Sequence, residues 1–265
     1  MNLLGDRPLG FVLENVVRPG NYRALANMPR RYVRVREGME RYFLGRGEYP
    51  ATFEVRTPLG PIHPKLWVKD DMFTVNEVFC RNDYKAGPDA QLAVDIGSNI
   101  GISALYFLTR SPTTRVILFE PVPSNLAHLR ENLERFADRY ELHEAAVADR
   151  EGTLPFRTEP TGRYGGLDQG DGTPDEDTIT VQVRHVNDVL EEILGRGVPI
   201  DVLKLDTEGS EAATVAAIRP DLLARIHRIY CEDEGNEVRI AGWRRHRACE
   251  TTALRNPIWP PRDPA

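Results

Sequence analysis

A chain of 265 residues, 41% of them hydrophobic, can bury the core of one or two domains, so extensive disorder is not expected. Its 34 Lys and Arg against 40 Asp and Glu give a net charge of −6, which argues against a nucleic-acid partner because an overall positive field is missing. The longest uncharged stretch of the most apolar region, residues 96–109, is too short to cross a bilayer, and the N-terminus lacks a signal-peptide pattern, so we expect a cytoplasmic protein without membrane contact.

Charge divides the chain into two parts that we expect to be separate domains. Residues 1–90 carry 14 basic and 11 acidic side chains, a net charge of +3, which leaves −9 for residues 91–265. Residues 18–46 hold eight arginines and two acids, interleaved with aromatic residues. Such a segment could meet phosphates or an acidic carrier protein, could mediate assembly into a homo-oligomer, or could be a solvated helix face.

The rest of the first part predicts a β-hairpin followed by a short helix. Residues 52–57 and 65–69 alternate between apolar and polar types, and Pro58–Pro61 supplies a turn between them. Residues 73–84 favour a short helix and a loop leading into the second part. Tyr84 could cover a cofactor bound there, or could be an ordinary core aromatic.

From residue 91 the pattern changes to strands that alternate with helices, which predicts a mostly parallel sheet with helices on both faces. The expected strands are 92–96, 115–120, 140–144, 201–205 and 228–231, and the expected helices are 102–108, 124–136, 186–194 and 212–226, the last interrupted near Pro220. Residues 162–178 contain five glycines and five acids, and we interpret them as a mobile lid.

The end of the chain leaves little room to complete a sheet. After Cys231 there are 34 residues, which we expect to form a helix around 238–247 and two short strands within 248–259. The last hairpin could therefore be abbreviated or borrowed from a partner copy.

A glycine turn, Gly97–Gly101, joins the first strand to its helix, where backbone N–H groups can face a ligand. The dinucleotide fingerprint has a glycine where Asn99 stands, so NAD is disfavoured. Asp95 would repel a pyrophosphate but suits a ligand with an ammonium group. Glu120 follows Gly101 by 19 residues, a spacing at which a carboxylate can accept both ribose hydroxyl protons of an adenosine cofactor.

Four ordered segments resemble one known family. Val94–Gly101, Phe119–Asn125, Ala145–Asp149 and Leu203–Glu211 are similar, in order and spacing, to the motifs of the FkbM family of S-adenosylmethionine-dependent methyltransferases. The resemblance covers about residues 72–235. It implies the class I methyltransferase fold, a Rossmann-like α/β fold whose seven-stranded sheet has one antiparallel strand, and it implies methylation of hydroxyl groups on sugars or secondary metabolites.

The resemblance also implies positions for the cofactor. Asp95, Gly97, Asn99 and Gly101 would line its methionine end, Glu120 would hold the ribose, and Ala146 would lie near the adenine.

Acidic residues follow two further strands and should open onto the same crevice. Asp206 is our first candidate for contact with the methionyl ammonium or the acceptor, and Glu208 or Glu232 could act as base. The same oxygens could bind Mg²⁺, or could simply cap helices. His185 is the candidate imidazole base, although most histidines are structural.

The sequence therefore predicts an S-adenosylmethionine-dependent O-methyltransferase. The expected acceptor is a small polyhydroxylated molecule such as a sugar, a natural product or a carrier-bound intermediate. The alternatives are an N-methyltransferase, an NAD-dependent oxidoreductase and a non-catalytic cofactor-binding module.

Overall fold

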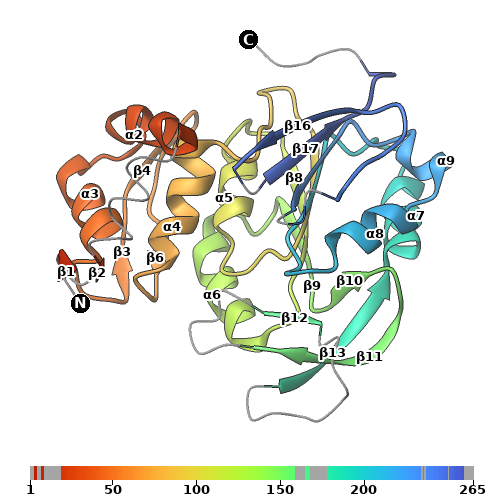
Figure 1. Cartoon of the computed structure of the whole chain (residues 1–265), viewed down its shortest axis with the longest axis horizontal. Coiled ribbons are helices and arrows are strands. Elements are labelled where there is room, and N and C mark those ends of the chain that lie inside the picture. Colours follow the sequence, from red (N-terminus) through yellow and green to blue (C-terminus); the bar gives the residue numbers. More distant parts are fainter. Residues whose placement is uncertain are drawn as a thin grey trace. The chain divides into compact units, whose positions relative to one another are not determined.

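The structure is a computed structural model that describes residues 3–4, 7–8, 19–158, 165–167, 178–233, 235, 237–249 and 251–259 (Figure 1). The chain divides into two compact units, Met1–Lys85 and Ala86–Ala265. No helix within the described ranges combines the length and the apolar character that crossing a membrane requires.

The N-terminal unit combines helices with short antiparallel strand pairs. Its helices are α2 (Pro19–Arg31), α3 (Val35–Leu44), α4 (Asp71–Val75) and the π-helix η1 (Asn76–Arg81). Its strands are β1 (Leu3–Leu4) with β2 (Arg7–Pro8), β3 (Ala51–Thr52) with β6 (Lys65–Leu66), and β4 (Val55–Thr57) with β5 (Gly60–Ile62). A hairpin is present as predicted, but its tight turn is at Pro58 and Leu59, so that β5 begins inside the predicted turn. The predicted second strand, 65–69, is a strand only at Lys65–Leu66, where it pairs with β3.

Aromatic packing holds this unit together, and part of its arginine charge is neutralised. Tyr32 packs edge-on against Phe53 with ring centroids 5.0 Å apart, and both side chains are buried. In α3, Glu37 pairs with Arg34 and Arg41 at 3.0 and 2.9 Å.

The C-terminal unit is built on a seven-stranded sheet in the order β16-β17-β15-β14-β7-β8-β9. The central parallel strands are β7 (Leu92–Ile96), β8 (Arg115–Phe119), β9 (Tyr140–His143), β14 (Val202–Leu205) and β15 (Arg228–Glu232). The chain ends in an antiparallel hairpin of β16 (Arg244–Ala248) and β17 (Thr251–Arg255), and β17 pairs antiparallel with β15. This is the class I methyltransferase sheet that the resemblance implies.

Helices cover both faces of the sheet, as predicted (Figure 1). On one side lie α5 (Ile102–Leu108), α6 (Pro123–Leu133) and the 3₁₀ turn η2 (Glu134–Phe136); on the other lie α7 (Val186–Gly195), α8 (Glu211–Ala217) and α9 (Pro220–Leu223). Alternate residues of β7, Leu92, Val94 and Ile96, enter the same core as the buried side chains of α7.

A second, four-stranded sheet has the order β10-β13-β11-β12. Its members are β10 (Ala146–Ala148), β11 (Gly152–Arg157), β12 (Gly166–Leu167) and β13 (Thr178–His185). Of the segment predicted as a lid, Gly165, β12 and Thr178 at the start of β13 are described, and the other residues lie outside the described ranges.

The predicted helix over 238–247 is wrong, and the closing hairpin comes from this chain. Arg244–Ala248 is the edge strand β16, whose residues alternate between exposed and partly buried positions. Its run of Arg and His side chains offers no apolar stripe for a helix but suits an edge strand with one solvated face. Arg245 turns inward and pairs with Asp233 at 3.1 Å, which ties the hairpin to the end of β15.

Candidate active site

The register of two neighbouring parallel strands places an acid beside a lysine in the interior. Asp95 of β7 lies directly opposite Lys204 of β14. Because successive strand residues point to opposite faces, both lie on the side away from the core that Val94 and Leu203 enter. The Lys204 ammonium is 2.9 Å from Asp95 Oδ1, and the two side chains are 2% and 0% exposed.

Lys204 links the ends of these two strands. Besides pairing with Asp95, its Nζ atom donates to the Gly97 carbonyl oxygen at 2.8 Å and lies 3.2 Å from Asp206 Oδ2. The two adjacent carboxylates keep the pKa of Lys204 above its ordinary value despite burial. Burial raises the pKa of Asp95, while Lys204 and a hydrogen bond from Ser103 Oγ oppose the rise.

The glycine turn adopts a backbone that few residues allow. Gly97, Asn99 and Gly101 have φ values of 79°, 47° and 87°. A Cβ atom on Gly97 would overlap the carbonyl oxygen of Asp206, so glycine lets the ends of β7 and β14 approach each other. The backbone N–H groups of Gly97 and Ser98 both donate to Phe119 at 3.0 Å, which fixes the turn against β8.

Glu120 comes directly after β8 and is held by three protein donors. Its Oε2 accepts from the Asn99 N–H at 2.8 Å, and its Oε1 accepts from the Val122 N–H at 3.0 Å and from Asn125 Nδ2 at 3.3 Å. Burial nevertheless raises the pKa of Glu120 to about 7. A carboxylate has about four lone-pair sites, so with three occupied roughly one remains for a ligand.

A cavity of about 690 Å³, part of it open to solvent, lies at the carboxyl ends of β7, β8 and β14. We call it the edge cavity. Polar groups of Asn99, Glu120 and Asp206 reach it, and its apolar wall includes Phe119, Ala146, Phe156 and Leu167. A few polar groups on an apolar wall are typical of a small-molecule site.

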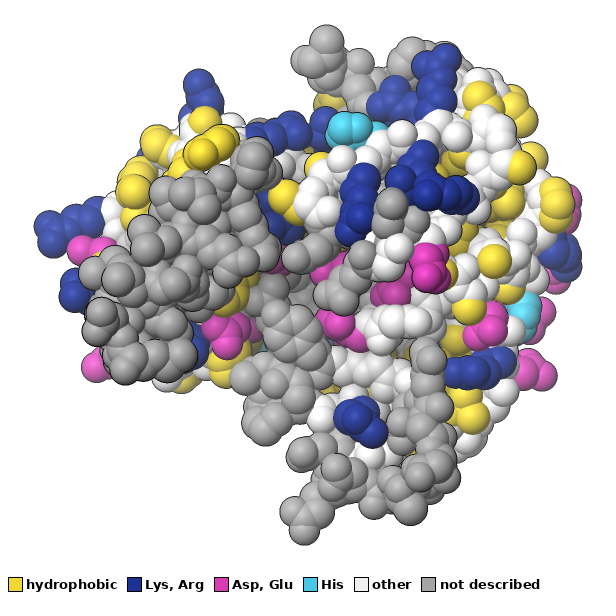
Figure 2. All heavy atoms as spheres, viewed as in Figure 1, with side chains coloured by type: hydrophobic (Ala, Val, Ile, Leu, Met, Phe, Trp, Pro, Cys, Tyr) yellow, Lys and Arg dark blue, Asp and Glu magenta, His cyan; other side chains and the backbone are white. Residues whose placement is uncertain are grey.

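A second cavity of about 760 Å³, which we call the acidic cavity, adjoins it through Glu208. Glu232, Asp233 and Glu237 also line it. Glu211 lines it too, but its carboxylate accepts from the Thr207 and Gly209 N–H groups at 2.6 and 2.9 Å. On the face in Figure 2, acidic side chains gather near the centre, and basic side chains lie over β16 and β17.

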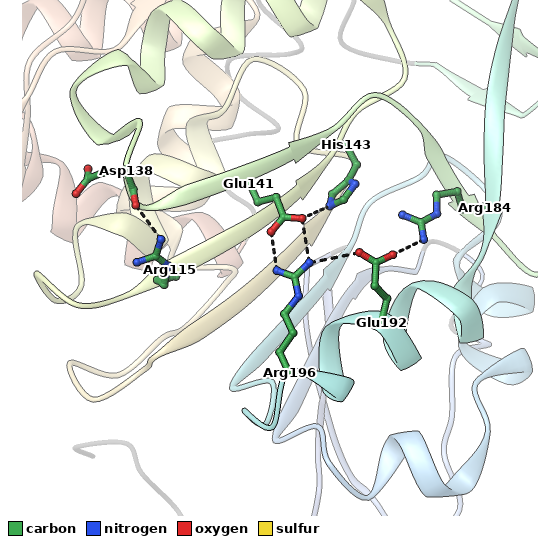
Figure 3. Close-up of polar contacts among 7 residues, drawn as sticks. All are labelled: Arg115, Asp138, Glu141, His143, Arg184, Glu192 and Arg196. Carbon is green, nitrogen blue, oxygen red and sulfur yellow. Dashed lines mark hydrogen bonds and ion pairs between the residues drawn. The ribbon is translucent and has the colours of Figure 1, made fainter.

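Two groups of residues among those described could offer metal ligands. Asp206, Glu208 and Glu232 can each present an oxygen, with these atoms within 4.8 Å of one another. The second group consists of Glu141, His143 and Glu192, whose ligand atoms also lie within 4.8 Å of one another. However, Arg196 binds both oxygens of Glu141 at 2.6 and 3.0 Å, and Arg184 binds Glu192 at 2.7 Å (Figure 3). The second group is therefore an ion-pair network.

The structure brings together most of the predicted residues. Six of them line the edge cavity: Gly97, Asn99, Glu120, Ala146, Asp206 and Glu208. Asp95 and Gly101 are not among its lining residues: Asp95 faces Lys204, and Gly101 begins α5 and faces Leu129 and Leu133.

The remaining candidates lie elsewhere. Glu232 lines the acidic cavity. His185 lines neither cavity; its Nδ1 accepts the Asn187 N–H at 3.1 Å and caps α7. Tyr84 belongs to the N-terminal unit, where it is buried, so its predicted role over the cofactor stays a prediction.

Sequence reasoning missed the second sheet's contribution to the edge cavity. Phe156 and Leu167 are paired across β11 and β12, far from the glycine turn in sequence. Asn125, which orients Glu120, lies within a recognised motif but was assigned no role; its amide two residues into α6 was the available signal.

Comparison with known proteins decides the family. Residues 95–246, more than half of the chain, match the model described as the methyltransferase FkbM domain. The chain belongs to this family. The family implies S-adenosylmethionine as the cofactor, and the edge cavity offers groups that fit it: Glu120 can accept from a ribose hydroxyl, and Phe119 and Ala146 contribute an apolar wall.

Relatives of this FkbM-family chain are distant. It is 28% identical over 161 residues to 2-O-methyltransferase NoeI of Sinorhizobium fredii, with 55% of this chain and 64% of NoeI covered. It is 26% identical over 208 residues to 31-O-demethyl-FK506 methyltransferase FkbM of Streptomyces tacrolimicus, with 67% of this chain and 80% of that relative covered. It is 27% identical over 202 residues to AMB antimetabolite synthetase AmbE of Pseudomonas aeruginosa, where 63% of this chain spans 9% of AmbE.

Solved structures are only weakly similar to this chain. A methyltransferase from Geobacter sulfurreducens is 16% identical, with a TM-score of 0.34 and coverage of 63% of this chain and 71% of that one. The strand order, and not this overlap, identifies the fold of the FkbM-family unit.

Proposed function

We propose that this protein transfers the methyl group of S-adenosylmethionine to a hydroxyl group of a small polyhydroxylated acceptor. The observation that supports this most is that Glu208 lines both the edge cavity, which would hold the cofactor, and the acidic cavity beside it. The names of two relatives, a 2-O-methyltransferase and a 31-O-demethyl-FK506 methyltransferase, support a hydroxyl acceptor.

Residues of the edge cavity would hold the cofactor. Glu120 would accept one ribose hydroxyl, Ala146 would lie against the adenine, and the backbone at Gly97 and Asn99 would face the methionine end. Asp206, whose Oδ2 lies 3.2 Å from the Lys204 ammonium, would bind the methionyl ammonium. When bound, S-adenosylmethionine supplies an electrophilic methyl group.

The acceptor would enter from the acidic cavity. Glu208 and Glu232 would accept hydrogen bonds from its hydroxyl groups, which favours a polyhydroxylated molecule. Glu208 would take the proton that the reacting hydroxyl loses as its oxygen bonds to the methyl carbon. Holding that oxygen in line is the main contribution expected from the protein.

A metal-assisted version of this chemistry uses the same three acids. Their oxygens lie within 4.8 Å of one another, so Mg²⁺ there would help the acceptor hydroxyl lose its proton. Initial rates measured after treatment with EDTA, and again after Mg²⁺ is restored, distinguish the metal-assisted mechanism from the metal-free one. Rates that EDTA leaves unchanged would exclude the metal-assisted mechanism.

The decisive test is acceptor-dependent formation of S-adenosylhomocysteine by the purified chain with a panel of sugars and polyhydroxylated natural products. We expect Glu208→Gln to lower turnover by roughly 100-fold while leaving cofactor affinity unchanged. Glu237→Gln is the matched control, because Glu237 lines only the acidic cavity, and we expect a smaller loss.

Two outcomes would contradict the proposal. Tight cofactor binding without turnover of any acceptor would favour a binding module, and NAD reduction would favour an oxidoreductase. Equal losses in Glu208→Gln and Glu237→Gln would contradict the role of Glu208 as base.

A further inference from the structure

A third cavity lies at the opposite ends of the same strands. We call it the basal cavity; it has a volume of about 1330 Å³, part of it open to solvent. Leu92, Arg115 and Tyr140, the first residues of β7, β8 and β9, line it together with Arg196 at the end of α7. It shares no lining residue with the edge or acidic cavity, so neither cavity accounts for it.

Its charged lining is mostly positive. Three arginines, Arg115, Arg139 and Arg196, and one acid, Glu141, line it. Glu141 is already bound at both oxygens by Arg196 (Figure 3). A lining with three cations and one anion has a net charge of +2.

The other two arginines bind backbone oxygens. Arg115 Nη2 donates to the Asp138 carbonyl at 2.9 Å, and the Asp138 carboxylate points away from Arg115 in Figure 3. Arg139 Nη1 donates to the carbonyls of Ser111 at 2.9 Å and Thr114 at 3.4 Å. Within the described part of the chain, no carboxylate forms an ion pair with Arg115 or Arg139.

The positive charges of Arg115 and Arg139 also repel each other. Burial lowers the pKa of Arg139, the Asp138 charge opposes this, and the nearby Arg135 and Arg115 charges lower it further. An anion between Arg115 and Arg139 would relieve this repulsion and engage two planar guanidinium groups.

The rest of the wall is apolar. Of its apolar lining residues, Val198 is 38% exposed, whereas Val116, Ile117 and Ile193 are buried. An inorganic ion would leave Val198 in contact with water, whereas a ligand with an apolar body would cover it.

We propose that the basal cavity binds a phosphate monoester that carries an apolar group. Such a dianion balances the net charge of +2, Arg115 and Arg139 hold its phosphate, and its apolar group packs on Val198. Because the site lies at the ends of the strands away from the edge cavity, its ligand binds alongside the cofactor and independently of the proposed methyl transfer.

Calorimetric titration of the full chain with phenyl phosphate tests this proposal, at constant ionic strength and with saturating S-adenosylhomocysteine. We expect one binding site, weaker binding of inorganic phosphate, and no binding of benzyl alcohol. Arg115→Gln should weaken binding about tenfold or more, because a charge-assisted contact is lost. Arg244→Gln is the matched control: it removes the same charge from β16, at the other edge of the sheet, and should leave affinity unchanged.

Each opposite result overturns the proposal. Absence of phenyl phosphate binding, or equal weakening by Arg115→Gln and Arg244→Gln, would exclude a specific site. Competition with S-adenosylhomocysteine would place the ligand in the edge cavity. Because Arg115 makes one backbone hydrogen bond and is exposed, we expect Arg115→Gln to fold, and its thermal unfolding checks this.

Discussion

A single buried lysine organises the charged groups at the ends of the central strands. Lys204 contacts Asp95, Asp206 and the Gly97 carbonyl, so one ammonium group joins two strands and the glycine turn. The sequence shows a lysine within a strand but not its partners. The direct pairing with Asp95 depends on strand register, which neighbouring residues do not determine.

Replacing Lys204 with methionine should destabilise the fold strongly. The change leaves the buried Asp95 carboxylate without its counter-charge, which typically costs about 3–5 kcal/mol. Urea denaturation measures the effect. Asp95→Asn combined with Lys204→Met should recover part of the loss, while the exposed Lys85→Met should change stability by less than about 0.5 kcal/mol. A loss as small as that of Lys85→Met would contradict the account.

Cofactor affinity should depend on the ionisation of Glu120. Its pKa is raised by burial from 4.5 to about 7, so at lower pH the free protein carries a proton where the ribose hydroxyl must donate. Affinity for S-adenosylhomocysteine should therefore fall as pH decreases below 7, approaching about tenfold per pH unit, and should level off above 7. Calorimetry between roughly pH 5.5 and 8.5 checks this. A slope that persists in Glu120→Gln would assign it to another group.

At the scale of elements, the glycine turn is the tightest point of the site. Gly97 combines a φ of 79° with a backbone contact that a Cβ atom would obstruct. Its importance was predictable from the Gly-x-x-x-Gly pattern after a strand, whereas the reason, the approach of Asp206, required the neighbouring strand.

Gly97→Ala should therefore reduce the free energy of unfolding by about 2 kcal/mol or more and weaken cofactor binding. Gly195→Ala is the matched control, because a Cβ atom there would meet nothing within 4 Å and its φ is not in the left-handed region. Thermal unfolding of both variants distinguishes them. Equal unfolding temperatures would show that the turn tolerates a side chain.

Local sequence patterns predicted the secondary-structure elements better than they predicted which elements lie next to each other. The apolar runs at 92–96 and 202–205 identified central strands because both faces are buried. The arginine-rich β16 was mistaken for part of a helix because an edge strand carries no apolar run. Phe156 and Leu167 could not be assigned to the edge cavity, because their sheet forms by long-range pairing.

At the scale of the whole molecule, the C-terminal unit separates different chemistry at the two ends of one sheet. The carboxyl ends of the strands open onto the edge and acidic cavities, and the amino ends open onto the basal cavity. The net charge of the chain conceals this separation, because it sums acids and arginines that lie at opposite ends of the strands.

The central claim is that the edge cavity binds S-adenosylmethionine through Glu120. Calorimetric titration with S-adenosylhomocysteine and with NAD tests it most directly, using the parent chain, Glu120→Gln and the exposed control Glu134→Gln. We predict that S-adenosylhomocysteine binds and NAD does not, and that Glu120→Gln weakens binding by roughly tenfold or more while Glu134→Gln has no effect. Binding of NAD instead, or S-adenosylhomocysteine binding that Glu120→Gln leaves unchanged, would contradict the account.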